Sequence, residues 1–348
     1  MIDVTVTVSL ADVSSYRPGE PISADYFTRF HETGDSGSAV MFNPPRFRHH
    51  VRPGETPADM AERAIAPMLE RQGANMLDEV DILIVHTQLP DTWFVGNGGE
   101  IAARFGIVPE WLIDLHNGGC ASFIHAIKLA REILQGTRAR SALIVNIANT
   151  AGRVFDQDQV RPLAQAAIPG DGAGVAWLVK SDRSPLLDIE TRHLPQYAGD
   201  MTSVAVPPRQ HWEAGPGQLR IGFTEAGISK VLSRGNEIVP EVARAVCDRI
   251  GVATDQVDLL VTNQPNRKFL QNWRDSLGLP AERHPDTFEE CGNLFGAGMP
   301  LTFDHAVTSG LVPDGSLVVF AGFAHAGDFA AAAALRWDGR LSSRDGSC

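Results

Sequence analysis

The sequence predicts an α/β fold made of two similar halves. Helix-like segments alternate with apolar, β-branched segments, and three such segments recur in the same order in both halves. This alternation predicts parallel sheets covered by helices, whose buried strands read as continuous Val, Ile and Leu runs. We place the first half at residues 1–180, a linker rich in Pro, Gly and polar residues at 181–218, and the second half at 219–348.

The first recurring unit is a helix followed by a strand. In the first half, a helix is predicted at 56–72 because a Thr N-cap precedes a Pro at the first helical position. It leads into VDILIVHTQLPD at 80–91, read as a buried strand. In the second half, the helix predicted at 236–250 leads into VDLLVTNQPNRK at 257–268. The two strands are therefore expected to hold equivalent places in their sheets.

The second recurring unit is a glycine-containing junction, a helix and a strand. GGCASFIHAIKLAREILQG, with a helix at 121–135, precedes the strand-like SALIVNIAN, and CGNLFGAGMPLTFDHAVTSG precedes SLVVFAGFAHAG. This correspondence places Gly119-Cys120 opposite Gly292-Asn293, each at a strand-to-helix junction. Loops at equivalent junctions of two duplicated halves can converge on one site.

The composition indicates a soluble globular enzyme or binding protein. The 348 residues are 43% hydrophobic and 21% charged, with no low-complexity tract. A net charge of −12 argues against a nucleic-acid partner. Without a long apolar run or a recognisable secretory signal, no membrane association and a cytoplasmic location are expected. The four widely spaced cysteines indicate neither a disulfide framework nor a metal site.

Cys120 is the candidate nucleophile. It follows two glycines and directly precedes a predicted amphipathic helix. The unpaired N–H groups and positive dipole end of a helix favour a thiolate, and the cysteine's backbone N–H can help to hold an oxyanion. The alternative is that Cys120 is a small buried side chain, as most lone cysteines are.

Five segments in order resemble the motif set of β-ketoacyl-acyl-carrier-protein synthase III and its relatives. They are DLHNGGCASFIHAIKLA, IPGDGAGVAWLV, TNQPNRKFL, CGNLFGAGMPLTFDHAV and GFAHAGDFAAAAALRW. The resemblance covers most of the chain and implies a thiolase-like five-layered αβαβα fold of two similar halves, usually assembled as a homodimer. It also implies that no cofactor is bound permanently. The cysteine receives an acyl group from coenzyme A or from the phosphopantetheine of an acyl carrier protein.

The resemblance assigns roles to several positions, with one departure. Cys120 matches the family nucleophile, and Asn293 matches the asparagine of the family's GN motif. Asn263 stands where the family has the histidine of its HQAN motif. A histidine there would stabilise the thiolate and a developing enolate, whereas an asparagine donates a hydrogen bond but cannot shuttle a proton. Asn263 thus reflects either specialisation for another reaction of the acyl-enzyme or an engineered replacement.

Two histidines are candidates for the missing imidazole or its surroundings. The closing loop reads GFAHAGD, which places His325 where an imidazole could approach Cys120, with Asp328 to orient it. The alternative is that His325 turns away and only its backbone serves the site. His86 ends the strand that corresponds to the one before Asn263, so it could face the same site.

Basic and bulky residues are candidates for binding the carrier and the acyl group. Arg267 and Lys268 follow NQPN, where the resemblance places basic residues near the pantetheine entrance, and Arg274 lies about two helical turns further on. An acidic enzyme needs such a patch to receive an acidic carrier protein, although ordinary solvated charges are the alternative. Trp93 and Phe94 lie where the family often shapes the acyl pocket across its dimer interface.

These features predict an acyltransferase. The enzyme would carry an acyl group on Cys120 from an acyl carrier protein or coenzyme A to a hydroxyl or amine of a small acceptor, as relatives in natural-product pathways do. A condensing synthase that still extends the acyl group with a malonyl-type unit is the second candidate. A non-catalytic partner subunit of a synthase is the third, and the retention of Cys120 and Asn293 weighs against it.

Overall fold

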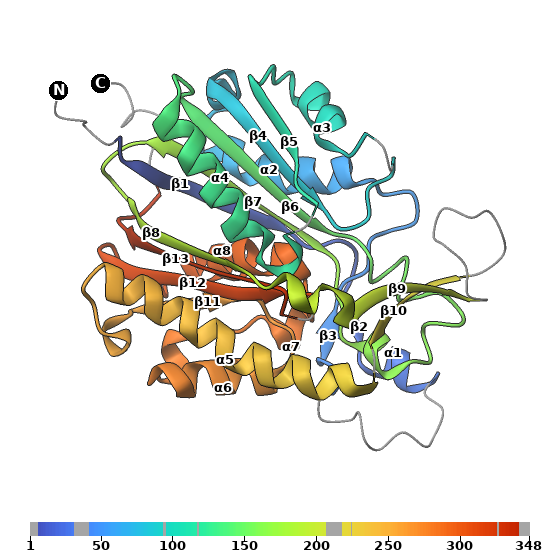
Figure 1. The fold of residues 1–348 in the computed structure, drawn as a ribbon. Coiled ribbons are helices and arrows are strands. Elements are labelled where there is room, and N and C mark those ends of the chain that lie inside the picture. The colour runs from blue at the N-terminus through green and yellow to red at the C-terminus, as the bar shows by residue number, and fades with distance from the viewer. Residues whose placement is uncertain are drawn as a thin grey trace.

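The computed structural model describes residues 6–30, 42–92, 95–116, 118–206, 218–223, 225–325 and 327–340. Helices and sheets are stacked in five layers (Figure 1). In order, the layers are α2 (Pro57–Gln72) with α3 (Gly98–Phe105), a first sheet, α4 (Ser122–Gly136) with α8 (Gly298–Thr308), a second sheet, and α5 (Glu225–Arg249) with α6 (Arg267–Leu277). The predicted five-layered αβαβα fold class is therefore confirmed.

The first sheet has the strand order β1-β7-β6-β4-β5. Its strands are β1 (Val8–Tyr16), β4 (Val80–Thr87), β5 (Trp111–Asp114), β6 (Ser141–Ala148) and β7 (Gly172–Lys180). Strand β4 runs parallel to β5 and β6, but β7 runs antiparallel to β6 and β1. The expectation of a wholly parallel sheet is therefore wrong. No α-helix lies between β6 and β7; a loop with one 3-10 turn, Ala164–Ala167, connects them, and antiparallel neighbours need no helical crossover.

The second sheet repeats this arrangement with the order β11-β12-β13-β8. Its strands are β8 (Leu186–His193), β11 (Leu259–Thr262), β12 (Ser316–Ala324) and β13 (Phe329–Trp337). Strand β11 is parallel to β12, and β13 is antiparallel to β12 and β8. Strands β11, β12, β13 and β8 thus occupy the places of β4, β6, β7 and β1, and the predicted equivalence of the segments at 80–91 and 257–268 is confirmed.

Strand β8 corrects the predicted linker at 181–218. It pairs with β13 from His193↔Phe329 to Leu186↔Leu335, so this part of the segment belongs to the second sheet. Only Leu186 and Ile189 of its eight residues are buried, which explains why the segment reads as polar. After it, β9 (Met201–Val206) forms a separate two-stranded sheet with β10 (Gln218–Phe223).

The short elements gather at one end of the layers, on the right in Figure 1. Strand β2 (Ile22–Ser23) pairs with β3 (Phe47–Arg48), and α1 (Asp25–Thr28) lies next to the β9–β10 pair. Helix α7 (Phe288–Cys291) contacts β3.

Within the described ranges, no helix combines the length and the apolar character needed to cross a membrane.

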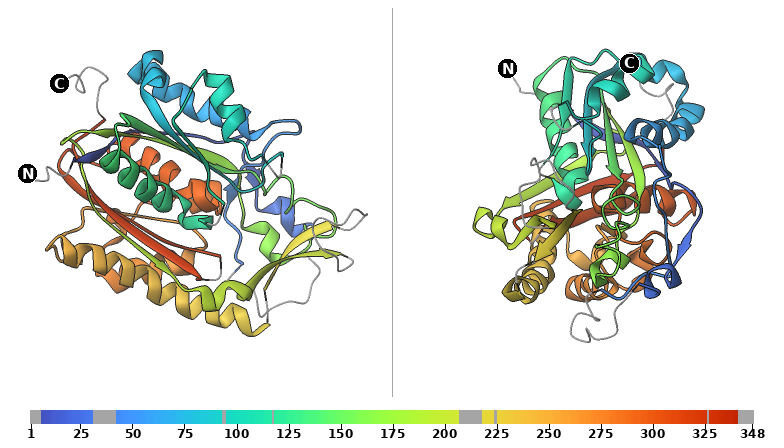
Figure 2. Two further views of the ribbon diagram at one scale, coloured as in Figure 1. Left: turned by 45° about the horizontal axis from the view of Figure 1, so that its top comes forward. Right: turned by 90° about the vertical axis from the view of Figure 1, so that its right-hand side faces the viewer.

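The central helices α4 and α8 lie between the two sheets, as the left view of Figure 2 shows. Phe320 of β12 lies between them, with its ring centroid 5.5 Å from that of Phe123 in α4 and 5.2 Å from that of Phe303 in α8. All three side chains are fully buried, and edge-to-face aromatic contacts of this kind stabilise a core beyond the area they bury. These contacts pack α4 and α8 against the second sheet, and the candidate site lies at the N-terminal ends of both helices.

Helix α2 begins where its sequence predicts. Thr56 is the N-cap, and its Oγ1 accepts a hydrogen bond from the Asp59 N–H at 3.1 Å. In return, Asp59 Oδ2 accepts from the Thr56 N–H at 2.8 Å, which completes a capping box. These bonds and Arg104 lower the pKa of Asp59 to about 2. The helix continues through Pro67 to Gln72 without a break.

Replacing Asp59 with alanine is expected to lower the free energy of unfolding by about 0.5–1 kcal/mol at neutral pH, since it removes half of the capping box. Asp59 stabilises the fold while it is ionised, above its unfolded pKa of 3.8, and this contribution is lost as the pH falls through about 2. Urea titrations of both proteins should therefore differ at neutral pH and converge in acid. A difference that persists undiminished at the lowest pH would contradict the assignment.

Candidate active site

Cys120 lies in a single 3-10 turn, Gly119–Ala121, directly before α4. Gly119 has a φ of 48°, a conformation that favours glycine. A methyl group on Gly119 would lie 2.9 Å from Ala324 Cβ and 3.0 Å from His325 Nε2. The glycine before Cys120 therefore serves both the turn and the close approach of the closing loop.

The surroundings of Cys120 favour a protonated thiol. Burial raises the pKa of the Cys120 thiol to about 12, and its own backbone N–H lowers it only in part. The expectation that the helix start favours the thiolate is therefore outweighed by the loss of water around the sulfur. Deprotonation needs a base close to the sulfur, or a ligand that changes its surroundings.

The counterpart of the Cys120 turn lies three residues beyond the predicted one. A second 3-10 turn, Phe295–Ala297, directly precedes α8, and Phe295 has the same φ of 48° as Gly119. Cys120 thus corresponds to Gly296, and the predicted pairing of Gly119-Cys120 with Gly292-Asn293 is wrong in register. The sequence hides this because a phenylalanine, instead of a glycine, adopts the left-handed conformation.

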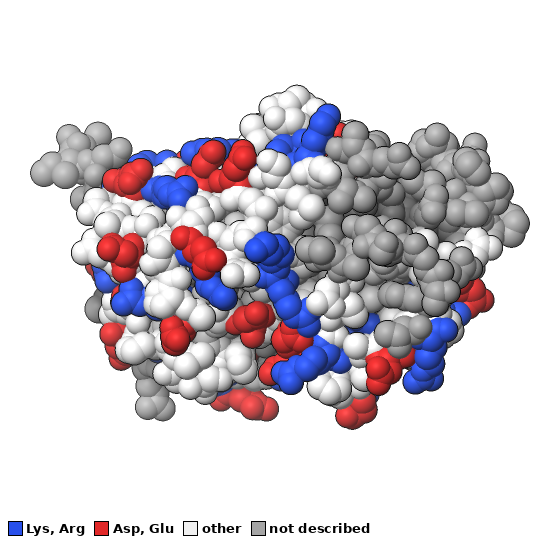
Figure 3. All heavy atoms as spheres, turned by 90° about the horizontal axis from the view of Figure 1, so that it is seen from below, with Lys and Arg blue, Asp and Glu red and all other residues white. Residues whose placement is uncertain are grey.

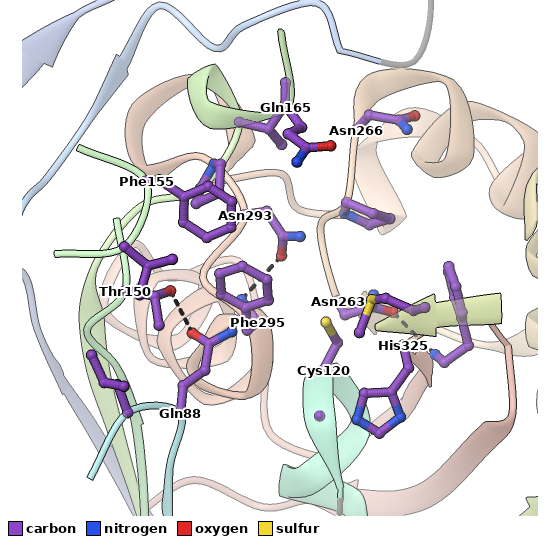
Figure 4. Close-up of a pocket in the computed structure, with 18 of the residues that line it drawn as sticks. Gln88, Cys120, Thr150, Phe155, Gln165, Asn263, Asn266, Asn293, Phe295 and His325 are labelled. Carbon is purple, nitrogen blue, oxygen red and sulfur yellow. Dashed lines mark hydrogen bonds between the residues drawn. The ribbon is translucent and has the colours of Figure 1, made fainter. Parts of the chain in front are cut away.

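Asn293 is fixed by the loop before β7. Its backbone N–H donates to the Ile168 carbonyl at 2.9 Å, and its carbonyl accepts from the Gly170 N–H at 3.1 Å. Its side-chain Oδ1 accepts from the Phe295 N–H at 3.0 Å. Because a backbone N–H can only donate, this bond defines which side-chain atom is the oxygen, and the Nδ2 group faces the open space beside Cys120 (Figure 4).

Asn263 follows β11 and is 1% exposed. Its Oδ1 accepts from the Phe323 N–H at 3.3 Å, so its Nδ2 group is the free end of the amide. This Nδ2 is buried and has no hydrogen-bond partner among the described residues. A buried donor without a partner is costly, and such a group at a cavity is a candidate contact for a ligand oxygen.

His325 lies beside Cys120 in the turn between β12 and β13 (Figure 4). Its φ is 51°, an uncommon backbone conformation for a residue with a side chain, and such strain is concentrated at functional sites. Its Nδ1 lies 2.9 Å from Asp328 Oδ1, and the Asp328 carbonyl accepts from the Leu194 N–H at 2.7 Å. Asp328 thus joins the imidazole to the end of β8, and the opposite nitrogen, Nε2, is the one near Gly119.

These side chains lie around one cavity of about 400 Å³. Of the predicted site residues, Cys120, Asn263, Asn293 and His325 line it, and Asp328 contacts His325. Apolar walls and further polar groups come from both halves: Phe42, Leu89, Val154, Phe155, Ile168, Met201, Val231, Phe269, Phe295, Phe323, His86, Thr87, Gln88, His116, Thr150, Gln165 and Asn266. No three His, Cys, Asp or Glu side chains in the described ranges are grouped to hold a metal ion.

The predicted binding residues lie outside this cavity lining or outside the described ranges. Arg267 forms an ion pair with Glu289, and Lys268 beside it is exposed. Arg274 is further along α6, with its Nε 3.9 Å from Asp275. Trp93 and Phe94 fall outside the described residues. The role of these five residues stays a prediction.

The polar residues of the lining that were not found from the sequence include Thr87, Gln88 and Thr150. They follow or end β4 and β6, and nothing in their residue types distinguishes them from ordinary turn residues. The expected facing of His86 toward the site is confirmed. Burial lowers the pKa of His86 to about 4, with His116 and His325 adding to the shift, so it is a neutral imidazole at neutral pH.

Comparison with known proteins finds matching protein families and relatives for this chain. Two family models match, described as 3-oxoacyl-[acyl-carrier-protein (ACP)] synthase III over residues 113–194 and as its C-terminal part over residues 247–337. The β-ketoacyl-[acyl-carrier-protein] synthase III of Thermosynechococcus vestitus is 29% identical over 83% of this chain and 86% of its own length. The Xanthomonas campestris pv. campestris protein of the same description is 27% identical over 90% of this chain and 94% of its own.

Solved structures agree on the fold. The 3-oxoacyl-(acyl carrier protein) synthase III of Pseudomonas aeruginosa superposes with a TM-score of 0.78 at 24% identity, covering 96% of this chain and 99% of its own. OleA of Xanthomonas campestris superposes with a TM-score of 0.77 at 16% identity, covering 95% and 97%. The layers are those of the thiolase-type fold.

The chain belongs to the β-ketoacyl-acyl-carrier-protein synthase III-like family of the thiolase superfamily, as a divergent member. It is accordingly an enzyme of the thiolase superfamily with a general acyl-transferring function.

Proposed function

We propose that this chain is an acyltransferase that uses Cys120 to move an acyl group from an acyl carrier protein or coenzyme A thioester to a hydroxyl or amine of a small acceptor in natural-product biosynthesis. The observation that carries this proposal is the amide group of Asn263 in the place of the family's histidine. Its amide is buried at the cavity, holds its orientation through Phe323, and offers only N–H donors. It can hold an oxyanion but cannot exchange a proton with an enolate, which disfavours decarboxylative condensation.

In the first step, the enzyme takes the acyl group. The Cys120 thiol gives its proton to His325, and the sulfur attacks the carbonyl carbon of the donor thioester. The Asn263 amide donates to the oxyanion that forms. The donor's carbon–sulfur bond then breaks, and the departing thiolate takes the proton from His325. Asp328, bonded to the other ring nitrogen, keeps the imidazole in place and stabilises its protonated form.

In the second step, the acceptor takes the place of the departed thiol. His325 accepts the proton of the acceptor's hydroxyl or amine while that group attacks the Cys120 thioester. The carbon–sulfur bond of the acyl-enzyme breaks, and the Cys120 sulfur recovers the proton. No electrons are exchanged, so neither step needs an oxidant or a reductant.

Condensation is the second candidate, since the curated relatives at 27–29% identity are β-ketoacyl-[acyl-carrier-protein] synthases. Acylated enzyme incubated with malonyl carrier protein should release little carbon dioxide and form no β-keto product. An Asn263→His variant should release at least about tenfold more, because the imidazole supplies the missing enolate support. Rapid decarboxylation by the unmodified enzyme would overturn the acyltransferase proposal in favour of condensation.

The proposal includes carrier docking at the start of α6 and a homodimer. Lys268 is exposed there, next to Asn266 at the cavity edge. Arg267, in contrast, is paired with Glu289, and the face below α5 and α6 carries both positive and negative side chains (Figure 3).

Support for the homodimer comes from β5, an edge strand of the first sheet. Trp111 and Leu112 on this strand are exposed, and edge strands of this kind favour pairing with another copy.

A further inference from the structure

The cavity has a polar side next to the first sheet that the two-step reaction does not use. Thr87 ends β4, Gln88 follows it, and Thr150 lies shortly after β6. Figure 4 shows Gln88 and Thr150 on one side of Cys120 and Asn266 and Gln165 at another end of the cavity. A group attached to the Cys120 sulfur can therefore extend toward Gln88 without occupying the place of Asn266.

Gln88 is held so that one end of its amide is committed and the other is open. Its backbone N–H donates to the Ile147 carbonyl at 3.1 Å. Its side-chain Oε1 accepts from Thr150 Oγ1 at 2.9 Å. The amide nitrogen is then turned toward the side of the cavity where Cys120 lies (Figure 4). The loop thus presents a fixed hydrogen-bond donor to whatever occupies this side.

Thr87 adds a second polar group on this side, a hydroxyl that has no partner among the described residues. Its side chain is 8% exposed, and its Oγ1 is buried without a hydrogen bond among the described residues. A hydroxyl in this state is uncommon in folded proteins and is normally satisfied by a ligand or an ordered water. Thr87 and Gln88 both line the cavity, so a ligand on this side is the candidate partner for the buried Thr87 hydroxyl.

The lining also limits the charge and size of that ligand. None of the described residues that line the cavity is Asp, Glu, Lys or Arg. Of the imidazoles in the lining, burial keeps that of His86 neutral and Asp328 already pairs with that of His325. An anionic substituent on the Gln88 side would therefore lack a permanent counter-charge, which is unfavourable. The rings of Phe155 and Phe295, stacked with centroids 6.4 Å apart, and Leu89 form apolar walls around the polar groups. The space suits a short chain with a neutral polar substituent.

We propose that this side of the cavity selects a short acyl group bearing a neutral hydroxyl or carbonyl substituent, which Gln88 and Thr87 bind while the thioester carbonyl faces Asn263. The proposal rests on the acyl-enzyme function proposed above. Thr150 is a positioning residue, because it acts only by fixing the Gln88 amide.

The test compares three coenzyme A thioesters for the rate at which they acylate Cys120, followed by intact-protein mass spectrometry. The probes are 3-hydroxybutyryl-, butyryl- and succinyl-coenzyme A, which share a four-carbon chain and differ in the substituent. We expect 3-hydroxybutyryl to load at least about tenfold faster than butyryl, because a site built to bind a hydroxyl rejects the analogue without it. Succinyl, with its carboxylate, should load most slowly.

The variants separate binding of the substituent from general damage. Thr87→Val has nearly the same shape but no hydroxyl, and Gln88→Leu removes the amide; each should bring the ratio of 3-hydroxybutyryl to butyryl loading down to about one. Thr87→Ser keeps the hydroxyl and should retain the preference. Thr308→Val, at the exposed end of α8, is the matched control and should keep the wild-type ratio.

Each outcome decides between the two proposals. If none of the three donors, nor acetyl-coenzyme A, acylates Cys120, the acyl-enzyme function fails. If butyryl loads as fast as 3-hydroxybutyryl in the unmodified enzyme, or Thr87→Val and Gln88→Leu keep the preference, the selection proposal fails while the acyl-enzyme function stands. If these variants slow only the later transfer to an alcohol and not the loading step, the polar side binds the acceptor, which also overturns the proposal.

Discussion

A Cys120→Ala variant is expected to lose acyl transfer by on the order of 10⁴-fold or more, because removal of a nucleophile leaves only the binding groups of a site to act. Asn263, Asn293 and His325 would still line the cavity, so donor thioester should bind while no acyl-enzyme forms. The measurement is the rate of thiol release from acetyl-coenzyme A in the presence and absence of an acceptor.

Cys247→Ala is the matched control for this loss. Cys247 is buried in α5 and does not line the cavity, so its replacement should leave thiol release near the wild-type rate. A Cys120→Ala protein that still transferred acyl groups at a substantial rate would mean direct transfer from donor to acceptor, without a covalent intermediate.

A His325→Ala variant is expected to slow acylation of Cys120 by about 10²–10⁴-fold near neutral pH, the range for loss of a general base. The variant should also gain a steep pH dependence. With the thiol pKa raised to about 12, the thiolate fraction rises about tenfold per pH unit over the range from about pH 7 to about pH 9. The unmodified enzyme should have a flatter profile, because His325 removes the proton as the sulfur attacks.

Asp328→Asn tests the positioning part of this arrangement. It leaves the ring of His325 in place but replaces the charged partner of Nδ1 with a neutral amide, so the loss of acylation rate should be smaller than for His325→Ala. His305→Ala, in α8 and outside the cavity lining, is the control and should change neither rate nor profile. If His325→Ala acylated at the wild-type rate with a flat profile, another group would have to be the base.

Much of the fold follows from local signals in the chain. The Thr56 N-cap and the apolar run of β4 are read directly from residue types, because each depends on neighbours in sequence. The mixed strand directions and β8 could not be read in this way. Strand β8 has only two buried residues, and its pairing with β13 depends on contacts made across the sheet.

The candidate site was predictable where a motif marked it. Cys120, Asn263, Asn293 and His325 come from four separate segments, and the structure brings them to one cavity. The register of the second junction was not predictable, because Phe295 holds a left-handed conformation that sequence assigns to glycine.

The polar side of the cavity and the state of Cys120 both depend on burial. Thr87 and Gln88 gain meaning only because a buried hydroxyl lacks a partner and an amide is held by Thr150. Likewise, the helix start favours a thiolate at Cys120, but the enclosure that raises its pKa belongs to the folded cavity. Sequence gives the type of each group and not the amount of water around it.

Whether Cys120 carries the acyl group is measured by the mass of the intact protein after incubation with acyl-coenzyme A donors. We expect a gain of one acyl group, located by peptide mapping on Cys120, that disappears in Cys120→Ala and when an alcohol or amine acceptor is added. An unchanged mass with every donor, or an acyl group located on another residue, would contradict it.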